Sequence, residues 1–358
     1  MATISVVLPG YPTHAGGGYK VVYQYANHLV QAGHQVHLVQ MRPDQARLRE
    51  EKLSRVVLRF LQYRLGRRMK PRWFALDRRV RVTNYARQFV GGVPRSDVVV
   101  ATAMETADLV ARVVARQGIQ GVYFIQGYES WGEDSMKVDA TWRLPLHRIV
   151  VGPWLAEKAV ELGVTAVQVS NAIDGADFPP GPPLTSRPLR VLALVSDLPL
   201  KRADLVAEAF ARIAADMPEV ELCTFGVIPK PSGLPSQSLH FQSPSPDRLR
   251  AAYQQCRVYI CASDTEGWGL PPAEAMSSGA AVVSTENGGV RGYADGVALF
   301  SPVGDATALA ENTLRLLRDE THCAELAGAG QARIRSYTPR MAAESFEREI
   351  VSVLGEAQ

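Results

Sequence analysis

The sequence predicts an α/β fold with two doubly wound, Rossmann-like parallel-sheet domains that face each other across a cleft. Short apolar runs alternate with amphipathic segments along the chain, and strands that alternate with helices form parallel sheets covered on both faces. The alternation occurs twice, before and after a proline-rich stretch at 177–188. The 358 residues suffice for two domains of ordinary size. Ligands of such domains are expected at the carboxyl ends of the strands.

We therefore expect an N-terminal domain at 1–176, a stiff linker at 177–188, a C-terminal domain at 189–337 and a terminal helix at 338–358. In the first domain the apolar runs predict strands at Ile4–Leu8, Gln35–Val39, Val98–Ala101, Val122–Ile125 and Arg148–Val151, with helices at Tyr19–Ala32 and Ala107–Gln117.

The second domain repeats the scheme. Its predicted strands are Arg190–Val195, Glu221–Phe225, Val258–Ala262 and Ala281–Ser284. Its predicted helices are Ala203–Asp216, Asp247–Gln255, Pro272–Ser278 and Ala306–Arg318. The last segment, Thr338–Leu354, is expected to form an amphipathic helix.

Composition and the start of the chain predict a cytoplasmic protein. The 46% hydrophobic and 21% charged residues are typical of a soluble globular chain. The apolar run at the amino terminus is too short for a signal peptide and lacks a basic leader, and no stretch approaches the roughly 20 apolar residues of a membrane span. The four cysteines show no metal-ligand spacing, so we expect them to be reduced and mostly buried. They are Cys223, Cys256, Cys261 and Cys323.

Positive charge is concentrated in one block. Residues 42–87 contain 15 Lys and Arg against 4 Asp and Glu, although the whole chain has a net charge of only +3. Apolar residues recur there at helical spacing, with arginines on the other faces. This is typical of a basic amphipathic helix that lies on an anionic membrane or binds an acidic partner. A surface helix packed on its own domain is the alternative, and nucleic acid is disfavoured because no recognised binding motif accompanies the charge.

The most informative stretch is Glu266-Gly-Trp-Gly-Leu-Pro-Pro-Ala-Glu274. It follows a predicted strand, and its two prolines fit the first turn of a helix that ends before Gly279. Glu266 is therefore expected on the loop and Glu274 near the start of the helix. Backbone N–H groups and the positive helix end between them favour a phosphate. Two carboxylates beside a phosphate suit a ligand with hydroxyls and phosphates, such as a nucleotide sugar; the alternative is that Glu274 only complements the helix dipole.

A second candidate lies near the amino terminus, where a predicted strand leads into Gly16-Gly17-Gly18 and a helix. Consecutive glycines let the backbone approach a ligand closely. They do not form the dinucleotide pattern G-x-G-x-x-G, so a nicotinamide cofactor is disfavoured. We take Gly17 and Gly18 as candidates, with a plain flexible turn as the alternative.

These segments resemble the retaining glycosyltransferases of family 4, which have the GT-B fold. The E-x7-E signature of that family matches Glu266–Glu274, and Gln31-Ala-Gly-His34 resembles the end of its first helix. The resemblance implies that Glu266 contacts the hydroxyls of the donor sugar, that Glu274 contacts the ribose, and that Gly17 and Gly18 face the donor phosphates. The residues between the two carboxylates are then donor-binding candidates: Gly267, Trp268, Gly269 and Leu270. The resemblance also implies a terminal helix that crosses back to the first domain.

The chain departs from the family pattern at two positions on the donor side. Gln126 stands where many members have a histidine; it can form hydrogen bonds but cannot titrate, so we expect either an altered sugar preference or an ordinary loop amide. Lys201 matches the family's phosphate-binding lysine, whereas Asp197 stands at the position of an arginine. Because a carboxylate repels a diphosphate, Arg202 is expected to assist Lys201. Thr285, after another predicted strand, is a further donor-binding candidate.

The resemblance implies a retaining hexosyl or deoxyhexosyl transferase that moves a sugar from a nucleotide-diphosphate donor to an acceptor hydroxyl. No cofactor or metal is expected, since basic groups can neutralise the diphosphate. The acceptor is a lipid carrier, a cell-surface polysaccharide or a small secondary metabolite, and the basic block predicts peripheral contact with the inner face of the cell membrane. A degenerate GT-B subunit that acts as a scaffold is the alternative, because Asp197 and Gln126 fall at donor positions. Paired carboxylates could also hydrolyse a glycoside, but the phosphate-binding context disfavours this.

Overall fold

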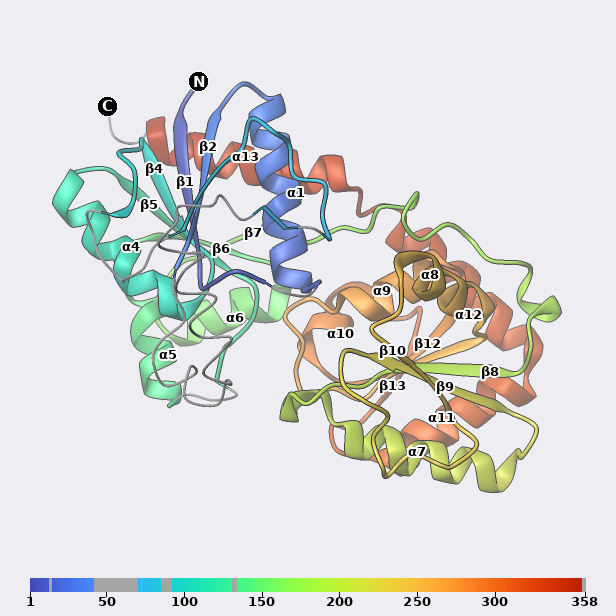
Figure 1. Cartoon of the computed structure of the whole chain (residues 1–358). Helices are drawn as coiled ribbons and strands as arrows, with labels where there is room; N and C mark the ends of the chain where they lie inside the picture. The colour runs from blue at the N-terminus through green and yellow to red at the C-terminus, as the bar shows by residue number, and fades with distance from the viewer. Residues whose placement is uncertain (13–14, 42–69, 72, 85–91, 131–133, 356–358) are drawn as a thin grey trace, which may run out of the picture. The chain divides into compact units, whose positions relative to one another are not determined.

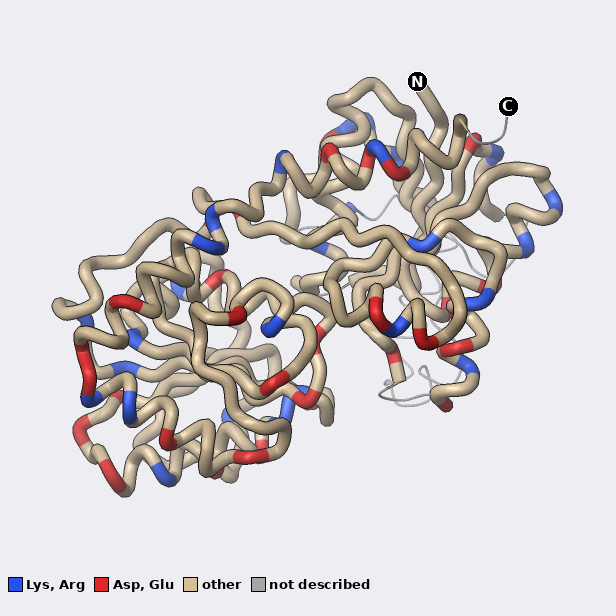
Figure 2. Tube along the Cα trace, turned by 180° about the vertical axis from the view of Figure 1, so that it is seen from behind, with Lys and Arg blue, Asp and Glu red and all other residues tan. Residues whose placement is uncertain are grey.

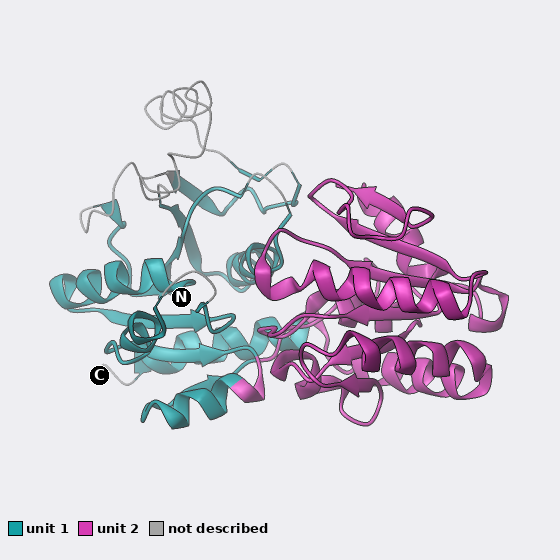
Figure 3. Ribbon diagram, turned by 90° about the horizontal axis from the view of Figure 1, so that it is seen from below, with its two compact units in different colours: residues 1–151, 155–169, 340–358 teal, residues 152–154, 170–339 magenta. Residues whose placement is uncertain are grey.

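A computed structural model describes residues 1–12, 15–41, 70–71, 73–84, 92–130 and 134–355 of the chain (Figure 1). The predicted basic amphipathic helix lies outside these ranges. The chain forms two compact units (Figure 3): unit 1 comprises residues 1–151, 155–169 and 340–358, and unit 2 comprises residues 152–154 and 170–339. Each unit contains its own parallel sheet, which confirms the predicted α/β class.

The sheet of unit 1 has seven parallel strands in the order β3-β2-β1-β4-β5-β6-β7. The strands are β1 (Thr3–Leu8), β2 (Gln35–Gln40), β3 (Arg81–Asn84), β4 (Val98–Ala101), β5 (Gln120–Ile125), β6 (His147–Val150) and β7 (Val167–Gln168). The helices are α1 (Gly17–Gln31), α4 (Met104–Gln117), α5 (Ser135–Trp142), α6 (Pro153–Glu161) and α13 (Pro339–Gly355). The five predicted strands are confirmed, whereas β3 and β7, at the two edges, were not predicted.

The strand order reverses at β1, which pairs with β2 on one side and with β4 on the other. In doubly wound sheets, ligands bind outside the carboxyl ends of the strands at this switch point. The glycine loop that joins β1 to α1 leaves the sheet here. The fold of unit 1 therefore places Gly17 and Gly18 where a ligand is expected.

The sheet of unit 2 has six parallel strands in the order β10-β9-β8-β11-β12-β13. The strands are β8 (Arg190–Leu194), β9 (Glu221–Gly226), β10 (Leu239–Gln242), β11 (Val258–Cys261), β12 (Ala281–Thr285) and β13 (Leu299–Ser301). The helices are α7 (Ala203–Asp216), α8 (Pro246–Gln255), α9 (Leu270–Ser277), α10 (Gly288–Ala294), α11 (Ala306–Arg318) and α12 (Glu320–Ile334). In Figure 1, α7 and α11 cover one face of this sheet and α8 and α9 cover the other.

The proline-rich stretch at 177–188 packs as part of unit 2. Arg187 is only 4% exposed, and its guanidinium donates to the carbonyls of Pro182, Cys256 and Ser278 at 2.8–2.9 Å. These bonds replace the water that a buried guanidinium loses. They tie the stretch to the carboxyl ends of α8 and α9. Apart from residues 152–154, the chain enters unit 2 at Ser170 and returns to unit 1 after Pro339.

The carboxyl-terminal helix α13 packs on unit 1 from residue 340 onward. Phe346 stacks on Tyr25 with ring centroids 4.5 Å apart and meets Phe124 edge-on at 5.2 Å. Ile350 is fully buried on the same helix. Three His–Glu pairs add polar contacts: His28–Glu347, His34–Glu347 and His147–Glu349. The helix thus forms part of the core of unit 1.

All four cysteines are buried and free of disulfides, which confirms the expectation that they are mostly buried. Burial raises the pKa of Cys256 to about 12 and those of Cys223 and Cys323 to about 11. Lys and Arg are interspersed with Asp and Glu along both units in Figure 2. No helix in the described part of the chain combines the length and apolar character needed to cross a membrane.

Candidate functional site

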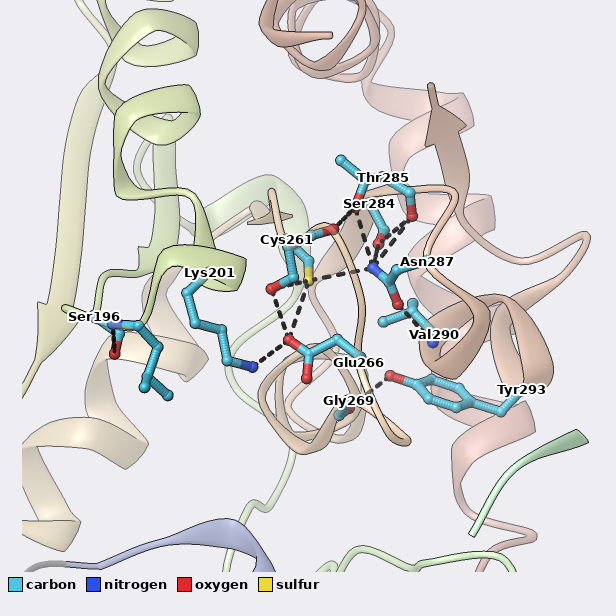
Figure 4. Close-up of polar contacts among 12 residues, drawn as sticks. Ser196, Lys201, Cys261, Glu266, Gly269, Ser284, Thr285, Asn287, Val290 and Tyr293 are labelled. Carbon is cyan, nitrogen blue, oxygen red and sulfur yellow. Dashed lines mark hydrogen bonds and ion pairs between the residues drawn. The ribbon is translucent and has the colours of Figure 1, made fainter. Parts of the chain in front are cut away.

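Polar side chains gather at the carboxyl ends of β8, β11 and β12 in unit 2 (Figure 4). They come from three loops, at 195–202, 262–269 and 285–290. The strands are adjacent and parallel, with β11 between β8 and β12, so the loops that follow them meet at one edge of the sheet.

Glu266 and Lys201 form the centre of this cluster. Lys201 Nζ donates to Glu266 Oε1 at 2.5 Å, and Ser263 Oγ donates to the same oxygen at 2.7 Å. The side chains of Lys201 and Glu266 are only 16% and 10% exposed, where solvent screens a charge pair less than at the surface. The structure therefore brings together two site residues that the sequence predicted separately and that lie 65 positions apart.

The backbone that follows Glu266 is held by two side chains. Trp154 Nε1 donates to the Gly267 carbonyl at 3.0 Å, and the Tyr293 hydroxyl donates to the Gly269 carbonyl at 2.8 Å. Gly269 has φ of +91°, in the left-handed region that favours glycine. This glycine turns the chain into α9, so the Glu266 loop has a fixed path.

The start of α9 offers fewer phosphate donors than the sequence prediction assumed. Pro271 and Pro272 occupy its first turn and have no N–H. The N–H of Ala273 points to the Gly269 carbonyl at 3.4 Å. Of the first-turn residues, Leu270 therefore has the N–H that remains for a ligand. A phosphate at this position would depend on Leu270 and on the preceding glycines.

Glu274, the second carboxylate, is half-buried in α9. The hydroxyl of Tyr253, a fully buried residue of α8, donates to Glu274 Oε2 at 2.9 Å. Burial, and then the nearby Glu274 carboxylate, raise the pKa of Tyr253 well above its usual range. Tyr253 therefore stays a hydrogen-bond donor and fixes one carboxylate oxygen.

Two predicted donor-binding side chains lie inside the protein instead of at its surface. Trp268 is 3% exposed and packs against the rings of Tyr293 and Tyr337. Thr285 is fully buried, and its hydroxyl donates to the Ser263 carbonyl at 2.5 Å. Both side chains support the loops of the site, and their contact with a donor stays a prediction that this burial does not favour.

Asn287 is a part of the site that the sequence prediction missed. It is 1% exposed, its Nδ2 donates to Ser284 Oγ and Thr285 Oγ1 at 3.1 Å, and its Oδ1 accepts the Val290 N–H at 3.0 Å. Asn287 thus caps α10 and connects that cap to the end of β12. An asparagine directly before a Gly-Gly pair at a helix start is the signal that could have indicated this role.

Arg202 was predicted to assist Lys201 at the diphosphate, but its guanidinium is already paired. Its Nη2 donates to Asp204 Oδ2 at 2.8 Å and its Nη1 donates to Asp264 Oδ1 at 2.9 Å. These hydrogen bonds raise the pKa of Arg202 further. Asp197, which stands at the family's arginine position, is exposed. With two carboxylates around Arg202, Lys201 is the cation best placed for a phosphate.

The predicted residues of unit 1 form a separate group. A Cβ atom on Gly18 would lie 3.2 Å from Gln126 Nε2, so the first turn of α1 lies against the side chain that follows β5. Gly17 is exposed at the start of α1. The structure thus places Gly18 next to Gln126, although they are distant in sequence.

Within the described ranges, no three His, Cys, Asp or Glu side chains are grouped so that they could hold a metal ion.

The region that contains this site is similar to known proteins. Residues 190–319 match a family model described as Glycosyl transferases group 1. O-antigen biosynthesis protein RfbC of Myxococcus xanthus is 28% identical over 204 residues, which are 54% of this chain and 16% of that protein. Phosphatidyl-myo-inositol mannosyltransferase of Mycolicibacterium smegmatis is 28% identical over 207 residues, 54% of each chain. The chain therefore spans about half or less of the length of these relatives.

Solved structures match over almost the whole chain. The complex of Anabaena Alr3699/HepE with UDP and glucose has a TM-score of 0.75 at 13% identity and covers 98% of this chain and 100% of that one. Sucrose-phosphate synthase from Thermosynechococcus elongatus has a TM-score of 0.77 at 16% identity and covers 99% and 100%. At such identities the likeness shows the fold alone. The fold is GT-B.

In this GT-B chain, one of the two groups of site residues lies within the region matched by the family model and the other lies outside it. Lys201, Glu266 and Glu274 lie within the residues matched by the group 1 model, whereas Gly18 and Gln126 lie in unit 1, outside that match.

Proposed function

We propose that the chain is a retaining glycosyltransferase that moves a hexosyl or deoxyhexosyl group from a nucleotide-diphosphate sugar to an acceptor hydroxyl. The observation that carries the proposal is the 2.5 Å pair between Lys201 and Glu266, at the carboxyl ends of two adjacent strands and within the group 1 match. A cation and a sugar-binding carboxylate side by side are suited to a ligand in which a phosphate is joined to a sugar.

Lys201 supplies positive charge where negative charge develops. Its ammonium has three N–H donors, and one of them is directed to Glu266. When the bond between the sugar and the diphosphate breaks, charge accumulates on the departing phosphate, and a fixed cation stabilises that state. The acceptor oxygen forms its bond to the sugar on the same face, and a phosphate oxygen of the donor takes the acceptor proton.

The two carboxylates bind the two ends of the donor. The hydrogen bonds described for Glu266 all go to Oε1, and we assign Oε2 to the sugar hydroxyls. Glu274 binds the ribose hydroxyls, with its other oxygen held by Tyr253. The backbone at Gly267, Gly269 and Leu270 lies between them and completes the phosphate contacts.

The first test is a thermal-shift titration with UDP, GDP, TDP and ADP. UDP is the first choice because four of the structural neighbours are complexes that contain UDP or UDP-glucose. We expect one nucleotide to raise Tm, slow hydrolysis of the matching nucleotide sugar, and a transfer product that keeps the anomeric configuration of the donor by NMR. An inverted product would refute the retaining mechanism.

Glu274→Gln tests the ribose contact without unpairing Tyr253, because a glutamine oxygen can still accept its hydrogen bond. A hydrogen bond to a charged group contributes about 1.5–3 kcal/mol, so we expect nucleotide affinity to fall by about ten- to a hundredfold. Isothermal titration calorimetry measures this change. Glu208→Gln, on the exposed surface of α7, is the control and should bind like the wild type; equal affinity in both variants would remove Glu274 from the site.

We propose a lipid carrier or a growing cell-surface polysaccharide as the acceptor, with a small secondary metabolite as the competing choice. Support comes from the names of the relatives, which are an O-antigen biosynthesis protein and a phosphatidyl-myo-inositol mannosyltransferase. Peripheral membrane contact through residues 42–87 stays a prediction. Co-sedimentation with anionic vesicles tests it, and equal pelleting of the wild type and a variant with Arg55, Arg59, Arg67 and Arg68 reversed in charge would contradict it.

A degenerate GT-B subunit with a scaffold role is the second candidate. The observation that favours it is the charge near Lys201: Asp197 replaces the expected arginine, and Arg202 is neutralised by Asp204 and Asp264. A scaffold of this kind would show no Tm shift with any of the nucleotides. The same titration therefore separates the two candidates.

A further inference from the structure

We infer that the Arg202–Asp264 ion pair is a positioning device that holds Lys201 against Glu266. Arg202 thus acts through Lys201 and does not bind the donor diphosphate itself. The kinetic consequences rest on the proposed function, whereas the positioning itself can be tested without any donor.

The two loops of the site are joined on both sides of Lys201. Lys201 ends a short 3-10 turn, η3 (Pro199–Lys201), that follows β8, and Glu266 lies on the loop after β11. The Asp264 N–H donates to the Leu200 carbonyl at 2.8 Å. Arg202 Nη1 donates to Asp264 Oδ1 at 2.9 Å. The residues before and after Lys201 are therefore both tied to the residue two positions before Glu266, which leaves the lysine little freedom to move away.

The backbone of Arg202 supports a role for its side chain. Arg202 has φ of 48° and ψ of 56°, and it shares positive φ with only one other non-glycine residue among those described, Ser243. This left-handed conformation is unfavourable for a residue with a Cβ atom, and a glycine would make the turn without strain. Strain that the surrounding structure maintains points to function, and here the side chain is fixed by Asp264 and Asp204.

The charges around Arg202 argue against direct binding of a diphosphate. Its guanidinium contacts two carboxylates, and this contact lowers the pKa of Asp204, so that partner stays ionised. A guanidinium between two carboxylates attracts a further anion weakly, because the carboxylates repel that anion at similar distances. Lys201 has one carboxylate partner and is the better phosphate ligand.

The test compares Asp264→Ala with Asp204→Ala. Both variants remove one carboxylate from the same guanidinium, but Asp264 joins two loops, whereas Asp204 is 65% exposed and lies two positions after Arg202 on its own segment. The first readout is the rate of reductive methylation of Lys201, measured by mass spectrometry of its peptide. We expect Asp264→Ala and Arg202→Gly to be labelled several-fold faster than the wild type, and Asp204→Ala to be labelled at the wild-type rate.

The second readout is kinetic and uses the donor found by the nucleotide screen. Misplacement of a catalytic group by about 1 Å can reduce the rate by about a hundredfold. We therefore expect kcat of Asp264→Ala and Arg202→Gly to fall by about tenfold or more, with a smaller rise in donor KM, because Lys201 acts mainly on the charge that develops as the phosphate departs. Tm of Arg202→Gly should stay close to that of the wild type, because relief of the strained turn offsets the lost ion pair.

Three results would overturn the inference: wild-type labelling of Lys201 in both Asp264→Ala and Arg202→Gly; equal effects of Asp204→Ala and Asp264→Ala; or tighter donor binding in Asp264→Ala together with weaker binding in Arg202→Gly. The last would make Arg202 a donor ligand that Asp264 competes for. If no nucleotide binds, the proposed function fails, and the labelling rates still decide the positioning role.

Discussion

Gly289 lies so close to the Glu266 loop that no side chain fits there. A Cβ atom at this position would lie 2.5 Å from the Glu266 carbonyl oxygen and 2.8 Å from Glu266 Cβ. At the scale of single residues, the site thus depends on small residues as well as on charges. Lys201 and Glu266 carry the chemistry that we propose, and Gly289 allows the loop of Glu266 to reach its place.

Gly289→Ala should therefore destabilise the protein and displace Glu266. Overpacking of this kind costs about 1–3 kcal/mol, which we expect to see as a lower free energy of unfolding in urea. Gly328→Ala is the control, because it lies in α12 with no atom within 4 Å of the new Cβ. It should stabilise the helix by about 0.5–1 kcal/mol, and a Gly289→Ala variant as stable as the wild type would show that the loop can shift.

The sequence predicted which residues carry charge at the site, but not how their surroundings use them. Lys201 and Glu266 were recognised from separate motifs, and the ion pair between them is a contact that the motifs did not predict. Trp268 and Thr285 were taken as ligand contacts because spacing does not reveal burial. The partners of Arg202 depend on Asp264, which lies 62 positions away, and its positive φ depends on the turn that the fold imposes.

At the scale of elements, strong local patterns were sufficient to predict helices and strands from the sequence, and weak patterns were not. Helices α7 and α11 were predicted at their observed bounds, because apolar residues recur on one face of each. The short strands β3, β7, β10 and β13 were missed; they have two to four residues and form the edges of the two sheets. Helix α12 was missed because its apolar residues are mostly alanine and its buried stripe is narrow. Pairing in the sheet and packing, which act over long distances, decide such elements.

The contact of α13 with unit 1 yields a prediction at this scale. Phe346→Ala removes a ring that contacts Tyr25 and Phe124, and loss of a buried aromatic side chain costs about 3–5 kcal/mol. We expect a correspondingly lower free energy of unfolding in urea. Val351→Ala, at a 46% exposed position of the same helix, should change stability by no more than about 0.5 kcal/mol. Equal stability of the two variants would mean that α13 does not complete the core.

At the scale of the whole molecule, the buried thiols make the free energy of unfolding depend on pH in the alkaline range. Burial raises the pKa of Cys256 to about 12, whereas a thiol in an unfolded chain ionises near pH 8.5. The folded state therefore retains a proton that the unfolded state loses. The contribution of the thiol to the stability of the folded state is complete below the pKa that the thiol has in the unfolded chain. It is lost as the pH rises toward the pKa of the thiol in the folded state.

We expect the free energy of unfolding to fall as the pH rises above about 8.5, by up to about 1.4 kcal/mol per pH unit for each buried thiol. Urea unfolding at several pH values below about 10, where tyrosines begin to ionise, measures the slope. Cys256→Ala should make the free energy of unfolding less dependent on pH, by the contribution of one thiol. An unchanged slope in this variant would show that Cys256 does not contribute.

Unit 1 is assembled from stretches that are far apart in the chain, and its last helix is made only after the whole of unit 2. During translation, Phe346 is therefore not yet present to cover the rings of Tyr25 and Phe124. These rings stay without this contact while about 170 residues of unit 2 are synthesised. A nascent chain with exposed apolar surface is prone to aggregation and is a typical client of chaperones. A fragment that stops before residue 340 would keep this apolar surface exposed. Fusion of residues 340–358 to residues 1–169 would cover the surface again and complete the core of unit 1.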